Sequence, residues 1–299
     1  MREGGMGQQA NILVTGINGQ VGYELLRSLQ GLGRVIGLDR AALNLESPDA
    51  IRRVVREVKP TIIVNPAAYT AVDRAENDVE GAQRLNVQAP ALLAEEAKRL
   101  GAALVHYSTD YVFDGTKDTP YVETDAVNPQ NVYGKTKLEG EREILASGCD
   151  HLILRTSWVY GMRGKNFLLT MLKLGAERDE LSVVADQIGA PTWSRTIATL
   201  TAHVLVQATR TADLTQWWAH RSGVYHLTAS GATSWQGFAE AIFELSSLGK
   251  RPVVQPIPAS SYPTPAMRPA NSRISNDKLA STFGVRAPDW REALALCMQ

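Results

Sequence analysis

The feature that most constrains the fold is a glycine-rich turn close to the amino terminus. Gly16, Gly19 and Gly22 have the spacing G-x-x-G-x-x-G, directly after the apolar segment 11–15 and at the start of the amphipathic segment 21–31. Because glycine has no side chain, the chain can turn tightly and its backbone can approach a pyrophosphate at the start of a helix. A strand, this turn and a helix together predict a dinucleotide-binding unit.

The first half of the chain alternates short apolar segments with amphipathic ones. The predicted strands are 11–15, 34–38, 61–65, 103–107 and 151–155, and the predicted helices are 21–31, 49–58 and 79–100. Short apolar strands between helices are typical of a parallel sheet that is covered on both faces. We therefore expect an α/β fold with a Rossmann-type, doubly wound parallel sheet, whose ligands bind beyond the carboxyl ends of the strands.

The second half is less regular and contains the proline-rich segment 252–269. We expect an NAD(P)-binding domain over residues 1–160 and a smaller substrate-binding lobe over 161–299, with some of its segments returning to the sheet. Residues 1–10 lack the apolar region of a signal peptide, so we interpret them as an extension or a tag.

The composition argues against several classes of function. Lys and Arg number 31, as do Asp and Glu, so no net charge attracts nucleic acid or an anionic membrane. No apolar run approaches the ~20 residues of a membrane span. The two cysteines, Cys149 and Cys297, indicate neither a disulfide framework nor a metal site. We expect a cytoplasmic protein without a metal ion, and without nucleic acid or a membrane as a partner.

The residues after the second and third strands bear on the choice of cofactor. Asp39 stands about 20 residues after the glycine turn, where an acid can bind the ribose hydroxyls of NADH. Arg40 follows it, and it either pairs with the 2′-phosphate of NADPH or lies on the surface as a solvated charge. Segment 65–68, Asn-Pro-Ala-Ala, either lets the cofactor lie close or forms a tight loop. The sequence leaves NADH and NADPH both open.

A second motif predicts carbonyl chemistry. Tyr133 and Lys137 form a Tyr-x-x-x-Lys pair, and on a helix they share one face. A phenol has a pKa near ~10, and we expect the ammonium and a bound oxidised nicotinamide to lower it. Lys137 can also hold the nicotinamide ribose. Thr109, after the fourth strand, is predicted to donate a hydrogen bond to a substrate carbonyl, whereas the alternative role of Ser108 and Thr109 is turn capping. We exclude His106 as an acid–base group because it lies within the strand.

These motifs resemble those of the extended short-chain dehydrogenases and, more narrowly, those of the dTDP-4-dehydrorhamnose reductase family. The resemblance extends over nearly the whole chain from about residue 11, and rests on the glycine turn and on segments 106–113, 131–137, 155–161, 186–192 and 262–272. It implies reduction of the C4 keto group of dTDP-4-dehydro-β-L-rhamnose, a dTDP-linked 4-keto-6-deoxysugar, by NADPH or NADH to give dTDP-β-L-rhamnose.

The resemblance also implies a role for individual residues. The catalytic residues are Thr109, Tyr133 and Lys137. The sugar contacts are Thr109, Asp110 and Trp158, the last of which shapes the sugar pocket. The cofactor contacts are Gly19, Gln20, Val21, Asp39, Ala68, Tyr69, Thr70 and Tyr107, in addition to Gly16, Gly22, Arg40, Tyr133 and Lys137 from the motifs themselves.

Some members of the family are described as homodimers bridged by Mg²⁺ through acidic side chains. Glu24 retains one candidate ligand, but Arg195 stands at the position of another and would repel a cation. The resemblance thus allows a homodimer and disfavours the metal-bridged form.

Two alternative functions share this fold. A nucleotide-sugar epimerase or 4,6-dehydratase regenerates its cofactor, and a dehydratase carries Asp-Glu after its threonine, whereas here Asp110 is followed by Tyr111. A regulatory subunit of methionine adenosyltransferase binds NADP without turnover, and the intact set of Thr109, Tyr133 and Lys137 favours turnover instead. Net consumption of NADPH or NADH distinguishes a reductase from both.

Overall fold

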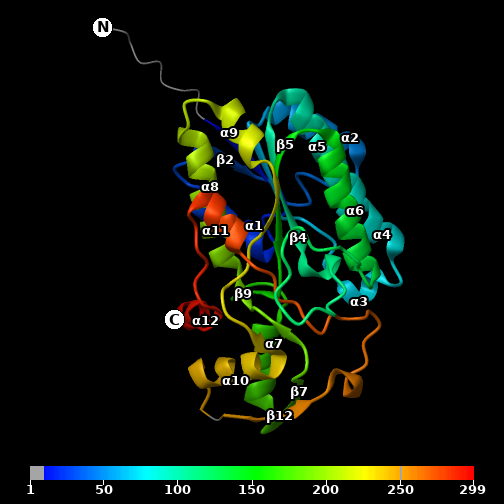
Figure 1. The fold of residues 1–299 in the computed structure, drawn as a ribbon, viewed down its shortest axis with the longest axis vertical. Helices are drawn as coiled ribbons and strands as arrows, with labels where there is room; N and C mark the ends of the chain where they lie inside the picture. The colour runs from blue at the N-terminus through cyan, green and yellow to red at the C-terminus, as the bar shows by residue number, and fades with distance from the viewer. Residues whose placement is uncertain (1–9, 250) are drawn as a thin grey trace.

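The computed structural model describes residues 10–249 and 251–299 and has a six-stranded parallel sheet at its centre (Figure 1). Its strand order is β10-β5-β4-β3-β1-β2, with neighbouring strands parallel throughout. The strands are β1 (Asn11–Val14), β2 (Arg34–Gly37), β3 (Ile62–Asn65), β4 (Ala103–Thr109), β5 (Asp150–Thr156) and β10 (Gly223–His226). The order reverses between β1 and β3, and at such a point a crevice forms beyond the strand ends. The predicted α/β, Rossmann-type fold is confirmed.

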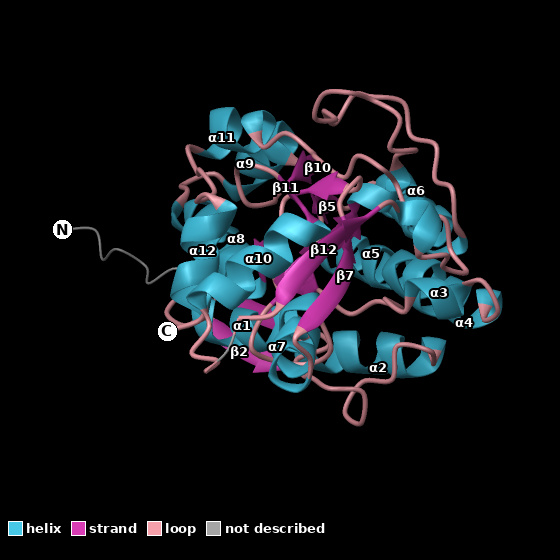
Figure 2. Ribbon diagram, turned by 90° about the horizontal axis from the view of Figure 1, so that it is seen from below, coloured by secondary structure: helices cyan, strands magenta, loops and turns pink. Residues whose placement is uncertain are grey.

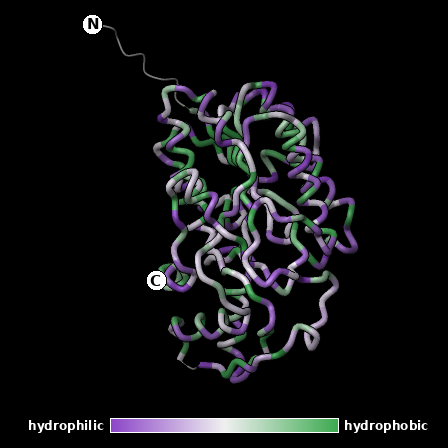
Figure 3. Tube along the Cα trace, in the orientation of Figure 1, coloured by the Kyte–Doolittle hydropathy of each residue, from purple (hydrophilic) through white to green (hydrophobic). Residues whose placement is uncertain are grey.

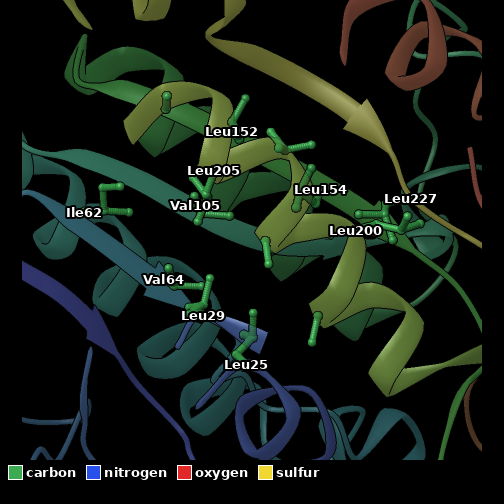
Figure 4. Close-up of a cluster of buried hydrophobic side chains, with 14 of the residues drawn as sticks. Leu25, Leu29, Ile62, Val64, Val105, Leu152, Leu154, Leu200, Leu205 and Leu227 are labelled. Carbon is green, nitrogen blue, oxygen red and sulfur yellow. The ribbon is translucent and has the colours of Figure 1, made fainter. Parts of the chain in front are cut away.

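The sheet is apolar on both faces because successive side chains of a strand point in opposite directions. Ile12 and Val14 contact one cluster of buried residues, and Leu13 between them contacts the other. In Figure 4, Leu25 and Leu29 of α1 (Gln20–Ser28) pack with residues of α8 (Ser194–Arg210) against the strands. The other face is covered by α2 (Pro48–Val58), α5 (Ala89–Leu100) and α6 (Val132–Ser147). Figure 3 shows the same concentration of apolar residues along the sheet.

The predicted helix 79–100 is interrupted by a different helical geometry. It consists of α4 (Val79–Gln83), the π-helix η1 (Arg84–Gln88) and α5. Pro90 has no N–H group, and its ring clashes with the carbonyl four residues earlier in an ordinary α-helix. A π-helical turn widens the helix just before this proline and removes the clash.

The second half of the chain contributes to both parts of the molecule. Helices α8, α9 (Leu214–Arg221) and α11 (Asp277–Phe283) pack with the sheet, and β10 forms its edge strand. The remaining elements surround a separate apolar cluster at the lower end of Figure 1 and face the viewer in Figure 2. The elements of this lobe are β6 (Val159–Tyr160), α7 (Phe167–Glu177), β7 (Glu180–Val184), β8 (Ile188–Gly189), β9 (Thr192–Trp193), β11 (Thr233–Ser234), α10 (Trp235–Leu245), β12 (Val253–Ile257) and α12 (Trp290–Cys297).

Three short helical segments complete the chain: α3 (Val72–Ala75), η2 (Asp110–Val112) and η3 (Ala259–Ser261). Because α8 and β10 pack with the sheet, the two lobes interleave along the chain after residue 160, and the domain boundary there stays a prediction. The expected extension over residues 1–10 lies, apart from Ala10, outside the described residues. Within the described residues, no helix is both long and apolar enough to cross a membrane.

A buried ion pair holds α6 against the sheet. Arg155 on β5 donates from Nε and Nη2 to the two carboxylate oxygens of Glu141 on α6, at 2.9 and 2.6 Å. Glu141 is 1% exposed and Arg155 is 4% exposed. Removing one partner of such a pair leaves the other charge buried without compensation.

We predict that Glu141→Ala lowers the free energy of unfolding by about 3–5 kcal/mol, because the Arg155 guanidinium keeps its burial and loses its carboxylate. Urea unfolding followed by circular dichroism measures the change. The matched control is Glu57→Ala, which removes the exposed pair of Glu57 with Arg53 and is expected to cost less than about 1 kcal/mol. Equal losses in the two variants would contradict the prediction.

Candidate active site

A cleft of about 630 Å³ opens at the carboxyl ends of β1, β3 and β4. Its walls come from both parts of the molecule: the glycine turn and the strand ends on one side, and the first residues of the lobe on the other. Most of the predicted site residues line it, namely Gly16, Gly19, Gln20, Val21, Gly22, Ala68, Thr70, Tyr107, Thr109, Asp110, Tyr133, Lys137 and Trp158. The crevice expected at the reversal of strand order is therefore present.

The glycine turn is too tightly packed for side chains. A Cβ atom on Gly22 would lie 2.3 Å from the carbonyl oxygen of Gly16, and one on Gly16 would lie 2.8 Å from the Cβ of Ala67. Gly16 also has a φ of +57°, which favours glycine. Helix α1 begins directly after Gly19 without a side-chain cap, so its first N–H groups are open to an anion. This cradle fits the pyrophosphate of a dinucleotide.

Three predicted cofactor contacts do not line the cleft. Asp39 accepts hydrogen bonds from the N–H groups of Ala41 and Ala42, both at 3.0 Å, and so closes a turn after β2. The exposed Arg40 pairs with Glu46. The hydroxyl of Tyr69 donates to Asp78 at 2.8 Å. The structure places all three beside the cleft wall rather than in it, and their roles toward a cofactor stay predictions.

Thr109 has the capping role and also borders the cleft. Its Oγ1 accepts from the N–H of Tyr111 at 3.2 Å, which caps η2, and donates to Oδ1 of Asp110 at 3.0 Å, and its role toward a substrate carbonyl stays a prediction. The carboxyl of Asp110 borders the cleft, and its Oδ2 is buried. Burial raises the pKa of this carboxyl to about 6, and hydrogen bonds from Ser272 and Thr109 act in the opposite direction. A carboxylate has several acceptor positions, so Asp110 can accept a hydroxyl donor in addition to these two.

Tyr133 is a neutral phenol in this structure. Desolvation by the surrounding protein raises its pKa to about 12, although a hydrogen bond with Thr109 acts in the opposite direction. We expected the ammonium of Lys137 and a bound oxidised nicotinamide to lower this pKa; the part assigned to Lys137 is wrong, and the part assigned to the nicotinamide stays a prediction. The reason is that Nζ of Lys137 donates to the carbonyl oxygen of Tyr107 at 2.7 Å and lies 3.0 Å from Nε2 of His106. A protonated phenol at neutral pH is a proton donor.

Lys137 is 1% exposed, which is rare for a lysine. Burial lowers its pKa to about 8, and the charge of Glu141 on the same helix limits the fall. The amine is therefore mostly protonated at neutral pH and loses its charge near pH 8.

Sequence reasoning missed the polar residues that meet this lysine. Thr15 follows β1, Asn65 ends β3 and His106 lies within β4, each two residues after an apolar residue of the cluster under α5 and α6. The alternation of side chains puts all three on the face that α6 covers. His106 is fully buried, as expected, yet it touches the motif lysine. The signal for this row in the sequence was the alternation in the three strands, where each polar residue stands two positions after an apolar residue of the same face.

On the lobe side, the cleft is bordered by the aromatic residue Trp158, which was predicted, and a second indole that was not predicted packs against it. The indole of Trp158 stacks on that of Trp235, with ring centroids 3.5 Å apart and planes 9° from parallel. Trp158 has a φ of +47°, a conformation that costs energy for a residue with a side chain. A Cβ on Gly189 would lie 2.5 Å from Cε2 of Trp158, so a residue without a side chain is needed behind the ring. Trp235 and Gly189 were not predicted as site residues.

Comparisons with known proteins identify the relatives of this chain. The model of the RmlD substrate binding domain family matches residues 10–299. A protein of Burkholderia thailandensis named dTDP-4-dehydrorhamnose reductase is 52% identical over 294 residues, covering 96% of this chain and 98% of the relative. This chain belongs to the dTDP-4-dehydrorhamnose reductase family.

Solved structures agree with this assignment. The dTDP-4-dehydrorhamnose reductase of Bacillus anthracis, solved in complex with NADP, has a TM-score of 0.89 and 33% identity, covering 97% of this chain and 99% of that one. The UDP-glucose 4-epimerase of Thermus thermophilus, solved with NAD, has a TM-score of 0.79 at 20% identity and covers 96% of this chain and 97% of its own. The second likeness shows the shared fold alone.

We predict that Gly22→Ala weakens NADPH binding about tenfold or more, because the added methyl group collides with the carbonyl oxygen of Gly16 and displaces the turn. Titration of tryptophan fluorescence with NADPH measures the dissociation constant. The control is Gly249→Ala, where the added Cβ meets no atom within 4 Å. Unchanged NADPH affinity in Gly22→Ala would remove the glycine turn from the cofactor site.

Proposed function

We propose that this chain reduces the C4 keto group of dTDP-4-dehydro-β-L-rhamnose with NADPH or NADH and releases dTDP-β-L-rhamnose. The observation that carries the proposal is the shared cleft: the protonated Tyr133, Thr109 and the glycine turn all border it, in a chain of the dTDP-4-dehydrorhamnose reductase family. The B. anthracis relative is a complex with NADP, which supports the cofactor class.

The chain's own residues would hold the cofactor and the sugar. The backbone of the turn from Gly16 to Gly22 would bind the pyrophosphate, and Lys137 would bind the nicotinamide ribose. When bound, the reduced nicotinamide supplies the hydride for sugar C4. Asp110 would accept a hydrogen bond from a sugar hydroxyl in the cleft, and Trp158 would form the wall beside the ring.

Tyr133 would deliver the proton that completes the reduction. As C4 receives the hydride, negative charge develops on its oxygen, and Thr109 would turn its O–H from Asp110 to donate a hydrogen bond to that oxygen. The Tyr133 phenol is protonated at neutral pH and is much more acidic than the hydroxyl it forms, so the proton moves from phenol to sugar. Solvent would then restore the proton of Tyr133, while Lys137, one helical turn further along α6, holds the ribose.

The alternatives gain no specific support from the structure. For an epimerase the likeness is one of fold, and the residue after Asp110 remains Tyr111, whose ring meets that of Tyr133 edge to face at 5.6 Å. A regulatory subunit that binds NADP without turnover would not need Thr109 and Tyr133, which both line the cleft here.

Several expectations accompany the proposal and stay predictions: the preference between NADPH and NADH, the cytoplasmic location and the homodimer. Arg40 would have to leave Glu46 to bind a 2′-phosphate. Glu24 and Arg195, the positions considered for a bridging metal, border one hollow between α1 and α8. Within residues 10–249 and 251–299 no group of three or more His, Cys, Asp or Glu side chains is arranged to hold a metal ion.

We predict that the purified chain oxidises one NADPH per dTDP-4-dehydro-β-L-rhamnose, and that Tyr133→Phe lowers kcat by about 10²–10⁴-fold because the proton donor is lost. Loss of cofactor absorbance, with chromatography of the sugar nucleotide, measures both. The control is Tyr262→Phe, which removes the hydroxyl of a tyrosine that is 63% exposed. Tight NADPH binding without turnover would instead favour the regulatory role.

We predict a bell-shaped dependence of kcat/KM on pH, with limbs near pH 6 and pH 8. As the pH falls through the pKa of Asp110, about 6, the carboxylate gains a proton, and the neutral carboxyl is a weaker acceptor for the sugar hydroxyl. As the pH rises through the pKa of Lys137, about 8, the ammonium is lost. Initial rates from pH 5 to 9.5 measure the profile, and in Asp110→Asn the acid limb should disappear while the alkaline limb remains.

A further inference from the structure

A continuous row of buried polar side chains runs from the glycine turn to Lys137. Oγ1 of Thr15 lies 2.6 Å from Oδ1 of Asn65, and Nδ2 of Asn65 lies 3.1 Å from Nδ1 of His106. Nε2 of His106 lies 3.0 Å from Nζ of Lys137. None of the four residues is more than 1% exposed. Thr15 directly precedes Gly16, so the row joins the two halves of the site.

The sheet and α6 together hold this row in place. Thr15 follows β1, Asn65 ends β3 and His106 lies in β4, which are neighbouring strands, and Asn65 pairs with His106 in register. Lys137 reaches them from α6, whose own position is set by the ion pair of Glu141 and Arg155. Among the described residues, the imidazole of His106 is the only side chain that is hydrogen-bonded to Nζ of Lys137.

Hydrogen-bond chemistry permits two proton arrangements of the row. An ammonium only donates, so a charged Lys137 needs an unprotonated Nε2 on His106, and the proton of the neutral ring is then on Nδ1. Nδ1–H must then donate to the amide oxygen of Asn65, which requires the amide to be turned so that its NH₂ group faces Thr15. With a neutral Lys137 amine the polarity reverses, and this is the orientation of the Asn65 amide in the structure: Thr15 donates to its Oδ1, its NH₂ group donates to Nδ1, and Nε2–H donates to Nζ.

We propose that His106 is a positioning residue for the reaction: its Nε2 accepts a hydrogen bond from the ammonium of Lys137 and so holds the charged amine beneath the cofactor and Tyr133. Asn65 and Thr15 in turn fix the ring and its tautomer. The proposal rests on the proposed function for its kinetic consequences but not for the arrangement of protons. His106 touches neither the cleft nor the reacting atoms, so it acts through Lys137.

The electrostatics of the pocket agree with this role. Burial and the charge of Lys137 lower the pKa of His106 well below its ordinary value, so the ring stays neutral and available as an acceptor. The charged group that favours the ammonium is Glu141 on α6, itself paired with Arg155 on β5. The other group in contact with Nζ of Lys137 is the backbone carbonyl oxygen of Tyr107 on β4. Losing the imidazole would remove one of two acceptors from a buried ammonium, which would lower the pKa of Lys137 further.

The kinetic experiment compares His106→Leu with His106→Gln in the full chain. Leucine removes the acceptor and keeps apolar bulk, whereas glutamine can place an amide oxygen close to the position of Nε2. We expect His106→Leu to move the alkaline limb of kcat/KM about one pH unit or more toward acid, and to lower kcat/KM at pH 8 about tenfold. His106→Gln should return the limb close to that of the unchanged protein.

The direct experiment is nitrogen NMR of the histidine side chains in the unchanged protein, assigned with His106→Gln. Below pH 7 we expect His106 to be protonated on Nδ1 and unprotonated on Nε2, with the pattern reversing as the pH passes 8. This readout requires neither substrate nor turnover. A protein that shows the tautomer change but does not oxidise NADPH with the sugar nucleotide would refute the proposed function and keep this inference.

Two outcomes would overturn the inference. One is an Nε2-protonated His106 below pH 7, which cannot accept from the ammonium. The other is a His106→Leu variant that loses thermal stability or activity uniformly, with its alkaline limb unmoved, because that is the behaviour of a residue that serves packing alone. If His106→Leu does not fold, the NMR measurement on the unchanged protein decides by itself.

Discussion

The arrangement of the site depends on the hydrogen bonds that hold the buried ammonium of Lys137. A lysine inside a protein loses its hydration, and the loss is tolerated only where acceptors replace the water. Here the carbonyl oxygen of Tyr107 and the ring of His106 do so, and both belong to β4. Helix α6 is thereby held at one height along the sheet, and Tyr133, one turn earlier on that helix, is placed at the cleft beside Thr109.

The cleft itself follows from the direction of the strands. In a parallel sheet all carboxyl ends lie along one edge, and the reversal of strand order between β1 and β3 separates the loops that leave it. The glycine turn borders this gap and lies so close to Ala67, from the loop after β3, that a Cβ on Gly16 would be 2.8 Å from the Cβ of Ala67. The aromatic pair of Trp158 and Trp235 closes the other side from the lobe. The dinucleotide half and the sugar half of the proposed site therefore meet at Tyr133.

Much of this was predictable because it depends on local pattern. The apolar periodicity located the strands of the central sheet from β1 to β5 to within two residues at either end, and the spacing of Tyr133 and Lys137 placed both on one helix. The π-helical turn before Pro90 was not predicted, because it is a local adjustment to one proline within a periodic segment. Trp235 escaped notice because it lies 77 positions after Trp158 and meets it only through the packing of the lobe.

The sequence by itself determined the class of fold, the glycine turn, the placement of Tyr133 and Lys137 on one helix, and the family, since each is written in residues that are close together along the chain. Tertiary structure decided the electrostatics. Whether Lys137 acts on Tyr133 or on His106 depends on which side chains the sheet and α6 bring within about 3 Å of one another, and the burial of Asp110 depends on the same packing. Hydrogen bonds and desolvation act over such distances, and contacts between residues 30 to 50 positions apart in the chain exist only once the strands have paired.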